Sequence, residues 1–207
     1  MKFKQCCLVV LATVFIVPII AESDTLRVYL MGNSLTDNID HEGLIQLVEA
    51  MGHTQIHGSH RIPGTPMDWL YNHPDNGFSH NPYGRWGEAF ANYQWDAVSV
   101  QPFLRPLAGD LEYASKFMDT AKVLSPDVQF YIYAQWPKEG YGDFAEVWLQ
   151  DVSPWIRENE RGFSKPERTK MYYETLVDTL RKARPDMKPV LLSPVGHVFY
   201  VLDQKIK

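Results

Sequence analysis

The sequence predicts an α/β protein, a three-layer α/β/α sandwich around a central, mostly parallel sheet of five strands. Short apolar runs, typical of strands buried on both faces, alternate along the chain with longer segments of helical spacing. The balance of 20 Lys+Arg against 25 Asp+Glu, with 45% hydrophobic residues, is that of an ordinary globular chain. A length of 207 residues fits one domain, or one domain with a large insertion.

The first 21 residues are predicted to be an export signal rather than part of the fold. Lys2 and Lys4 precede an apolar run that ends at Ala21, and Glu22 follows it. The run is shorter than the roughly 20 residues of a membrane-spanning helix, although an uncleaved anchor is the alternative. We therefore expect cleavage near Ala21, a secreted or periplasmic product without stable membrane insertion, and a single domain over residues 22–207.

Composition excludes several classes of protein and site. Both cysteines, Cys6 and Cys7, lie in the signal segment, so the mature chain has no disulfide and no cysteine metal site. A net charge of -5 without long Lys/Arg clusters excludes a basic nucleic-acid binder. The phosphate-binding patterns GxxxxGK[ST] and GxGxxG do not occur, and no cofactor is expected.

Five strands and three long helices are expected in alternation. The strands cover residues 26–31, 54–62 (more polar and near an edge), 96–100, 128–134 and 190–195. The first helix begins after Asp40, which is a suitable N-cap, and Gly52 ends it; the others cover residues 111–124 and 167–184. Residues 137–166 are rich in aromatic side chains. They form either a lid or binding insertion, or a helical insertion that buries its own apolar side chains.

A serine follows the first strand at the edge of the sheet where ligands bind. The turn has the sequence GNSLTD over residues 32–37, and ligands of open parallel sheets bind beyond the carboxyl ends of the strands. Ser34 would therefore present its hydroxyl at the top of the sheet. The alternative is that Asn33 or Ser34 only caps the helix that follows.

This turn resembles the first motif of the SGNH (GDSL) hydrolases, a family with a flavodoxin-like α/β/α fold. The resemblance implies that Ser34 is the nucleophile of an ester hydrolase. The family's second motif supplies an oxyanion-hole glycine, and Gly64 in HRIPGTPMDWL matches it. The third supplies an asparagine after the third strand, where this chain has Gln101, whose amide sits on a stem one carbon longer. The three motifs occur in the family's order and cover most of the mature chain.

The family's fourth motif, Asp-x-x-His, does not occur in residues 1–207. We expect that the sequence stops before this acid-base pair or encodes a form without it, so that the chain is poorly active. His197, which follows the last strand, is the best internal candidate for a base, with Asp203 about two helical turns further on. A surface role for His197 is the alternative. The residues three places before the seven histidines are Asn38, Ala50, Thr54, His57, Leu70, Gly77 and Pro194.

Other polar and aromatic residues define the open alternatives. His53 and His57 would share one face of a strand while His60 points away, so a metal site there is not expected. Asp37 and Arg61 either orient substrate or are solvated loop charges.

The substrate is expected to be a small carboxylic ester or a carbohydrate acetyl ester. Asn33, Asp37, Trp69 and Trp136 are the candidate substrate-binding residues. The alternative function is a non-catalytic, secreted carbohydrate- or ligand-binding protein that uses Trp69, Trp136 and Tyr141 as stacking surfaces. Core or rim packing is the competing explanation for these aromatic residues.

Overall fold

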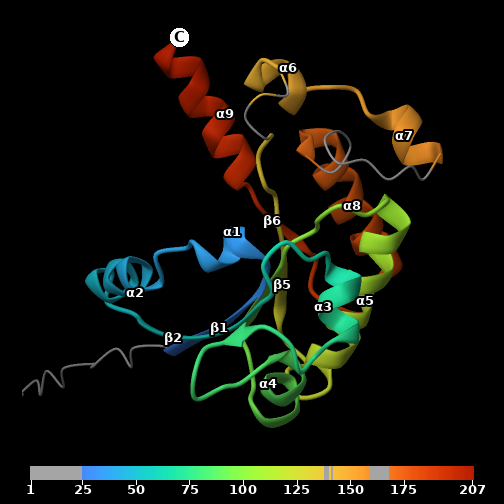
Figure 1. Ribbon diagram of the computed structural model, residues 1–207. Coiled ribbons are helices and arrows are strands. Elements are labelled where there is room, and N and C mark those ends of the chain that lie inside the picture. The colour runs from blue at the N-terminus through green and yellow to red at the C-terminus, as the bar shows by residue number, and fades with distance from the viewer. Residues whose placement is uncertain (1–24, 138–139, 141, 159–167) are drawn as a thin grey trace, which may run out of the picture.

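The computed structural model describes residues 25–137, 140, 142–158 and 168–207, so the predicted signal segment lies outside it. Over these residues the chain forms a six-stranded sheet in the order β3-β2-β1-β4-β5-β6 (Figure 1). Five strands are mutually parallel, and β3 runs antiparallel to β2. The strands are β1 (Thr25–Gly32), β2 (Thr54–Arg61), β3 (Phe78–Ser79), β4 (Ala97–Val100), β5 (Gln129–Tyr133) and β6 (Leu191–Ser193).

The predicted α/β class and mostly parallel sheet are confirmed, but the expected number of strands is wrong. The additional strand, β3, has two residues and pairs only with His60 and Arg61 at the end of β2. A segment this short has no hydrophobic period, so the sequence pattern does not reveal it. The polar sequence of β2 predicted a place near an edge of the sheet. β2 is next to the edge strand β3, which pairs with the last two residues of β2.

Helices connect the strands and cover the sheet. They are α1 (Ser34–Asp37), α2 (His41–Ala50), α3 (Met67–Asn72), α4 (Trp86–Asn92), α5 (Leu107–Lys122), α6 (Phe144–Trp148), α7 (Ser153–Glu158), α8 (Lys170–Ala183) and α9 (Val195–Ile206). Asp40 caps α2 as predicted, because its carboxylate accepts a hydrogen bond from the Gly43 N–H at 2.9 Å. Gly52 follows α2 with a φ of +84°, a conformation that glycine adopts without strain. No helix in the described residues is long and apolar enough to cross a membrane.

The hydrophobic core lies on one face of the sheet. Parallel register places Tyr29, Val98 and Phe130 side by side, and all three are fully buried. Helices α3, α5 and α8 cover this face on the side of the sheet opposite α2 (Figure 1). Helix α8 contributes Leu176 and Leu180, both fully buried. The alternation of buried and partly buried residues along β5 fixes which side chains enter this core.

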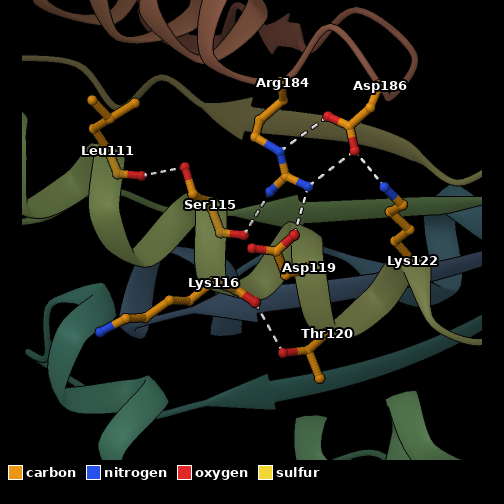
Figure 2. Close-up of polar contacts among 8 residues, drawn as sticks. All are labelled: Leu111, Ser115, Lys116, Asp119, Thr120, Lys122, Arg184 and Asp186. Atoms are coloured by element: carbon orange, nitrogen blue, oxygen red, sulfur yellow. Dashed lines mark hydrogen bonds and ion pairs between the residues drawn. The ribbon is translucent and has the colours of Figure 1, made fainter.

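Arg184, just after α8, fastens α8 to α5 (Figure 2). Its guanidinium donates to the Ser115 carbonyl at 3.2 Å, to Asp119 Oδ1 at 2.6 Å and to Asp186 Oδ1 at 3.3 Å. Lys122 of α5 also pairs with Asp186. Hydrogen bonds from Lys122 and Arg184 hold the pKa of the Asp186 carboxyl well below its usual range. The pairing fixes the two core helices at their ends distant from the carboxyl edge of the sheet.

The opposite face of the sheet is only partly covered, and we call it the open face. It borders a cavity of about 650 Å³ beneath α2. Leu26 is 41% exposed, and α2 buries none of its side chains although Leu44 lines the cavity. The sheet residues of the open face are Leu26, Val28, Leu30, Gln55, Ala97, Ser99, Tyr131, Tyr133 and Ser193.

Candidate active site

Ser34 is exposed and is the first residue of α1, directly after β1. Asn33 is its N-cap, with a φ of -110° and a side-chain Oδ1 that accepts from the Leu35 N–H at 3.1 Å. The capping role that the sequence left open for Asn33 is therefore present. It leaves the Ser34 side chain outside the cap, at the carboxyl edge of the sheet.

Gln101 holds the turn that carries Ser34. It follows β4, the strand next to β1, and is 1% exposed. Its Oε1 accepts from the Thr36 hydroxyl at 2.9 Å and from the Asn33 N–H at 3.3 Å. Its Nε2 donates to Asn33 Oδ1 at 2.9 Å. One Nε2 hydrogen is therefore engaged within the turn, which makes Gln101 a positioning residue whatever the second hydrogen does.

Gly32 allows this close approach. A Cβ at residue 32 would lie 2.1 Å from Thr36 Oγ1 and 2.7 Å from Gln101 Oε1. Both distances are shorter than any contact that a carbon atom makes with a hydroxyl or amide oxygen. Only glycine lets the end of β1 pass beneath this pair of hydrogen bonds.

A pocket of about 210 Å³ lies beside Ser34, and we call it the Ser34 pocket. Two of the predicted substrate-binding residues, Asn33 and Trp136, line it together with Ser34. The Trp136 ring packs against Phe199 of α9, with centroids 4.7 Å apart. Among the described residues, the lining consists of Asn33, Ser34, Leu35, Phe103, Gln135, Trp136 and Arg168.

Five predicted site residues lie outside this lining: Gln101, described above, His197, described below, and Gly64, Trp69 and Asp37. Gly64 follows β2 with a φ of +72°, and a Cβ there would meet nothing within 4 Å, so its backbone borders open space. Trp69 stacks on His73, with ring centroids 3.8 Å apart. Asp37 forms an ion pair with Arg61 at the surface. Tyr141 lies outside the described residues.

His197 is also outside the Ser34 pocket. It is exposed in the first turn of α9, and its ring stacks on Tyr200 with centroids 5.8 Å apart. Asp203, the acid that would orient it, pairs instead with Lys207 at 3.0 Å. The arrangement matches the surface role that the sequence analysis gave as the alternative. The lining of the Ser34 pocket contains no histidine among the residues that the structure describes.

The rings of three histidines lie in a row beside the middle of β2, with the His41 and His57 planes 9° apart and the His57 and His80 planes 36° apart; we call them the histidine column. The His57 ring lies 4.8 Å from that of His41 and 4.1 Å from that of His80, between centroids. Burial, then the nearby His80, His41 and Arg61, lower the pKa of His57 from 6.5 to about 4. Burial likewise lowers the pKa of His41. The sequence gave no sign of this column, because its members come from three separate segments.

The histidine column is not a metal site by the arrangement of the described residues. Across residues 25–137 and the described part of the remaining chain, no three His, Cys, Asp or Glu side chains are placed to hold a metal ion. His60, which the sequence analysis set apart from His53 and His57, is fully buried and its Nε2 lies 2.6 Å from the Asn76 carbonyl.

Sequence reasoning missed Gln135, Phe103 and Arg168 in the Ser34 pocket. Gln135 comes shortly after β5, so the rule that places ligands at strand ends could have identified it. Phe103 follows β4 in the same way. Arg168 precedes α8 and follows no strand, and nothing in its local sequence distinguishes it from other surface arginines.

Comparison with known proteins shows the fold. No family model and no curated protein match the sequence. A provisionally assigned GDSL-like lipase from Parabacteroides merdae matches with a TM-score of 0.51 at 11% identity, covering 88% of this chain and 83% of that one. A DUF4886 family protein from Bacteroides uniformis has a TM-score of 0.49 at 18% identity, covering 84% of this chain and 68% of that one. A provisionally assigned SGNH hydrolase from Slackia heliotrinireducens has a TM-score of 0.47 at 18% identity, with 86% and 83% covered.

The overlap with the Parabacteroides merdae structure spans most of both chains, so it concerns the whole α/β/α arrangement and not a single motif. The turn that carries Ser34 follows the central strand β1 of that arrangement. The resemblance to SGNH hydrolases that the sequence motifs indicate is therefore confirmed at the level of the fold: this chain has the SGNH hydrolase fold.

Proposed function

We propose that this chain is an exported ester hydrolase of the SGNH type, with Ser34 as its nucleophile. The observation that supports this most directly is the placement of Ser34. It is an exposed serine at the end of the central strand β1, in a turn fixed by Gln101, beside a small pocket. A cleft at the carboxyl edge of a parallel sheet is where such chemistry is normally found.

The proposed reaction is acyl transfer in two steps. Ser34 Oγ attacks the ester carbonyl carbon and loses its proton to a base, while the carbonyl oxygen becomes an oxyanion. The alcohol then leaves with a proton, and water releases the acid from the acyl-serine. We propose the Gly64 N–H and the second Nε2 hydrogen of Gln101 as oxyanion donors, each of which would be worth about 3–4 kcal/mol of barrier in a water-excluded site.

The proposal includes low activity for this chain. A serine hydroxyl is a weak nucleophile without an adjacent base, and no histidine lines the Ser34 pocket in the described part of the chain. Loss of the base in other serine hydrolases costs about a million-fold in kcat. Binding and the oxyanion hole alone retain roughly 10³–10⁴-fold over water.

The test is hydrolysis of 4-nitrophenyl acetate by residues 22–207, with and without added imidazole as an external base. We expect slow turnover that imidazole accelerates, and we expect Ser34→Ala to abolish that acceleration. Ser115→Ala is the matched control, since Ser115 lies in α5 and its hydroxyl donates to the Leu111 carbonyl at 2.7 Å. Equal turnover by the parent chain and Ser34→Ala would refute Ser34 as nucleophile. Fast turnover without imidazole would refute the low-activity claim and point to an internal base such as His197.

The substrate is proposed to be a small carboxylic ester or a carbohydrate acetyl ester. Trp136 supports this choice, since a half-buried indole beside a nucleophile offers a flat surface to a sugar ring. Binding of an acetylated saccharide that is equal in the parent chain and in Ser34→Ala, without any release of acetate, would instead favour the non-catalytic binding protein.

A further inference from the structure

The Ser34 pocket is lined by side chains whose buried nitrogen atoms have no hydrogen-bond partner. Gln135 is 2% exposed, and its Nε2 is unpaired within the described residues. The Nε atom of Arg168 and the Nδ2 atom of Asn33 are buried and unpaired in the same way. The three residues come from separate places in the fold: the start of α1, the end of β5 and the start of α8. All of them line the one pocket beside Ser34.

These unpaired atoms share one chemical property: all are hydrogen-bond donors. Buried donors in native proteins are nearly always paired, because a buried N–H without an acceptor is costly. The described residues of the lining include no Asp or Glu that could supply the acceptor. Asn33 Oδ1, an acceptor in the lining, is already occupied by the Leu35 N–H and by Gln101 Nε2. The pocket therefore lacks an acceptor-rich group.

The pocket also holds a positive charge, the guanidinium of Arg168. The Arg168 guanidinium lies 5.9 Å from the centre of the Phe103 ring, and no carboxylate of the described residues forms an ion pair with it. A ring face stabilises a cation but accepts none of its directed N–H bonds. A planar guanidinium matches the two oxygens of a carboxylate, and the Nε atom of Arg168 has no partner among the described residues.

Resting on the proposed function, we propose that Arg168 and Gln135 bind a carboxylate of the substrate next to the ester bond that Ser34 attacks. The substrate would thus be an anionic ester. A pocket of about 210 Å³ is smaller than a typical ligand site, so the acid group is carried on a short arm, as in a succinyl ester or an O-acetylated uronic acid with its carboxylate free. Arg168 and Gln135 are specificity-determining residues in this proposal, and Ser34 remains the reacting group.

The experiment is calorimetric titration of succinate into four proteins: the parent chain, Ser34→Ala, Arg168→Met and Lys182→Met. Methionine keeps an apolar stem over Phe103 while it removes the charge. Lys182 is exposed near the far end of α8, about 20 Å from Arg168 along the helix, so Lys182→Met is the control for loss of one charge. Thermal melts of each variant establish that it is folded.

We expect succinate to bind the parent chain, Ser34→Ala and Lys182→Met equally, and Arg168→Met at least tenfold more weakly, as loss of a charge-assisted hydrogen bond predicts. If Arg168→Met does not fold, Gln135→Met replaces it, with a several-fold loss expected. Absence of saturable succinate binding, or equal binding by the pocket variants, overturns the proposal. Tighter binding of inorganic phosphate at the same site overturns its assignment to carboxylates.

The succinate titration tests the carboxylate site independently of whether Ser34 hydrolyses an ester. Succinate binding that depends on Arg168 but not on Ser34 supports the anion subsite even if no ester is hydrolysed. If hydrolysis is observed, the ratio of kcat/KM for succinyl and butyryl 4-nitrophenyl esters should fall at least tenfold in Arg168→Met. An unchanged ratio overturns the subsite while it leaves Ser34 as nucleophile.

Discussion

The side-chain amide of Gln101 makes three hydrogen bonds, and all of them end on residues 33 and 36 of the turn that carries Ser34. A glutamine reaches further than the asparagine that the family motif leads one to expect at this position. The extra carbon lets the amide reach the turn itself. The longer side chain is thus explained by what it holds in place, independently of any role in an oxyanion hole.

Replacing Gln101 by Leu should destabilise the fold. The change keeps the approximate volume but leaves the buried Asn33 N–H and Thr36 hydroxyl without their acceptor, at about 1–3 kcal/mol of unfolding free energy for each orphaned group. Urea unfolding measures the loss. Gln129→Leu is the control, since the Gln129 amide bonds the Pro189 and Phe130 carbonyls at the sheet edge and should cost about 1 kcal/mol or less. Equal losses in the two variants would contradict the role assigned to Gln101.

Sequence reasoning brought Asn33, Ser34 and Gln101 together because they follow adjacent strands, and parallel strands end at the same edge. It also named Trp136, as an aromatic stacking surface, and Trp136 lines the Ser34 pocket. The rule could not identify Arg168, because Arg168 precedes a helix and only tertiary packing brings it to the pocket. His197 also follows a strand, but the direction in which α9 leaves the sheet places its side chain outside the Ser34 pocket.

At the scale of elements, the histidine column joins α2, β2 and the segment after β3. His57 lies between the rings of His41 and His80 and near Arg61, whereas Asp37 and Asp40 lie near His41. Burial withdraws His57 from water, and His80, His41 and Arg61 lie nearby, so a proton on its ring is unfavourable in the folded state.

The fold should therefore lose stability on acidification. The pKa of His57 is about 4 in the folded chain and 6.5 ordinarily, so its contribution is complete above pH 6.5 and is lost as the pH falls towards 4. After allowance for solvent screening we expect a loss of about 1–2 kcal/mol from this group. Urea unfolding at pH 7.0 and pH 4.5 measures it. His57→Phe, which keeps a ring in the column, should reduce the pH dependence, whereas His53→Phe at an exposed position should leave it unchanged. If the difference in unfolding free energy between pH 7.0 and pH 4.5 were the same in both variants, this explanation would be wrong.

Periodicity predicted the long helices and the parallel strands, because each buries a face with its own repeat. It could not predict β3, which has two residues, or how well α2 packs. The apolar residues Leu44, Leu47, Val48 and Met51 follow helical spacing as expected, yet none of them is buried. Spacing shows that a helix has an apolar side and not how closely that side meets a sheet.

At the scale of the whole molecule, the core is confined to one side of the sheet and the open face exposes apolar strand residues. Parallel sheets are normally covered on both faces. We expect the native chain to bind the dye 1-anilinonaphthalene-8-sulfonate at pH 7, with fluorescence enhancement that Leu26→Lys strongly reduces. Leu149→Lys, which changes an equally apolar residue that is 53% exposed at the end of α6, is the control. Dye fluorescence that is absent, or that is equal in both variants, would contradict the exposure of this face.

The order of the strands also has a kinetic consequence. The hydrogen bonds that fix the Ser34 turn join residues 68 positions apart, and they exist only where β1 lies beside β4. That pairing closes a long loop which includes all of β2, β3 and α4, and loop closure of this kind is slow compared with helix formation. During refolding, α5 and α8 can form their first turns on their own, whereas the turn that carries Ser34 must wait for its neighbouring strand. We therefore expect the turn that carries Ser34 to become ordered late, after the loop between residues 33 and 101 has closed.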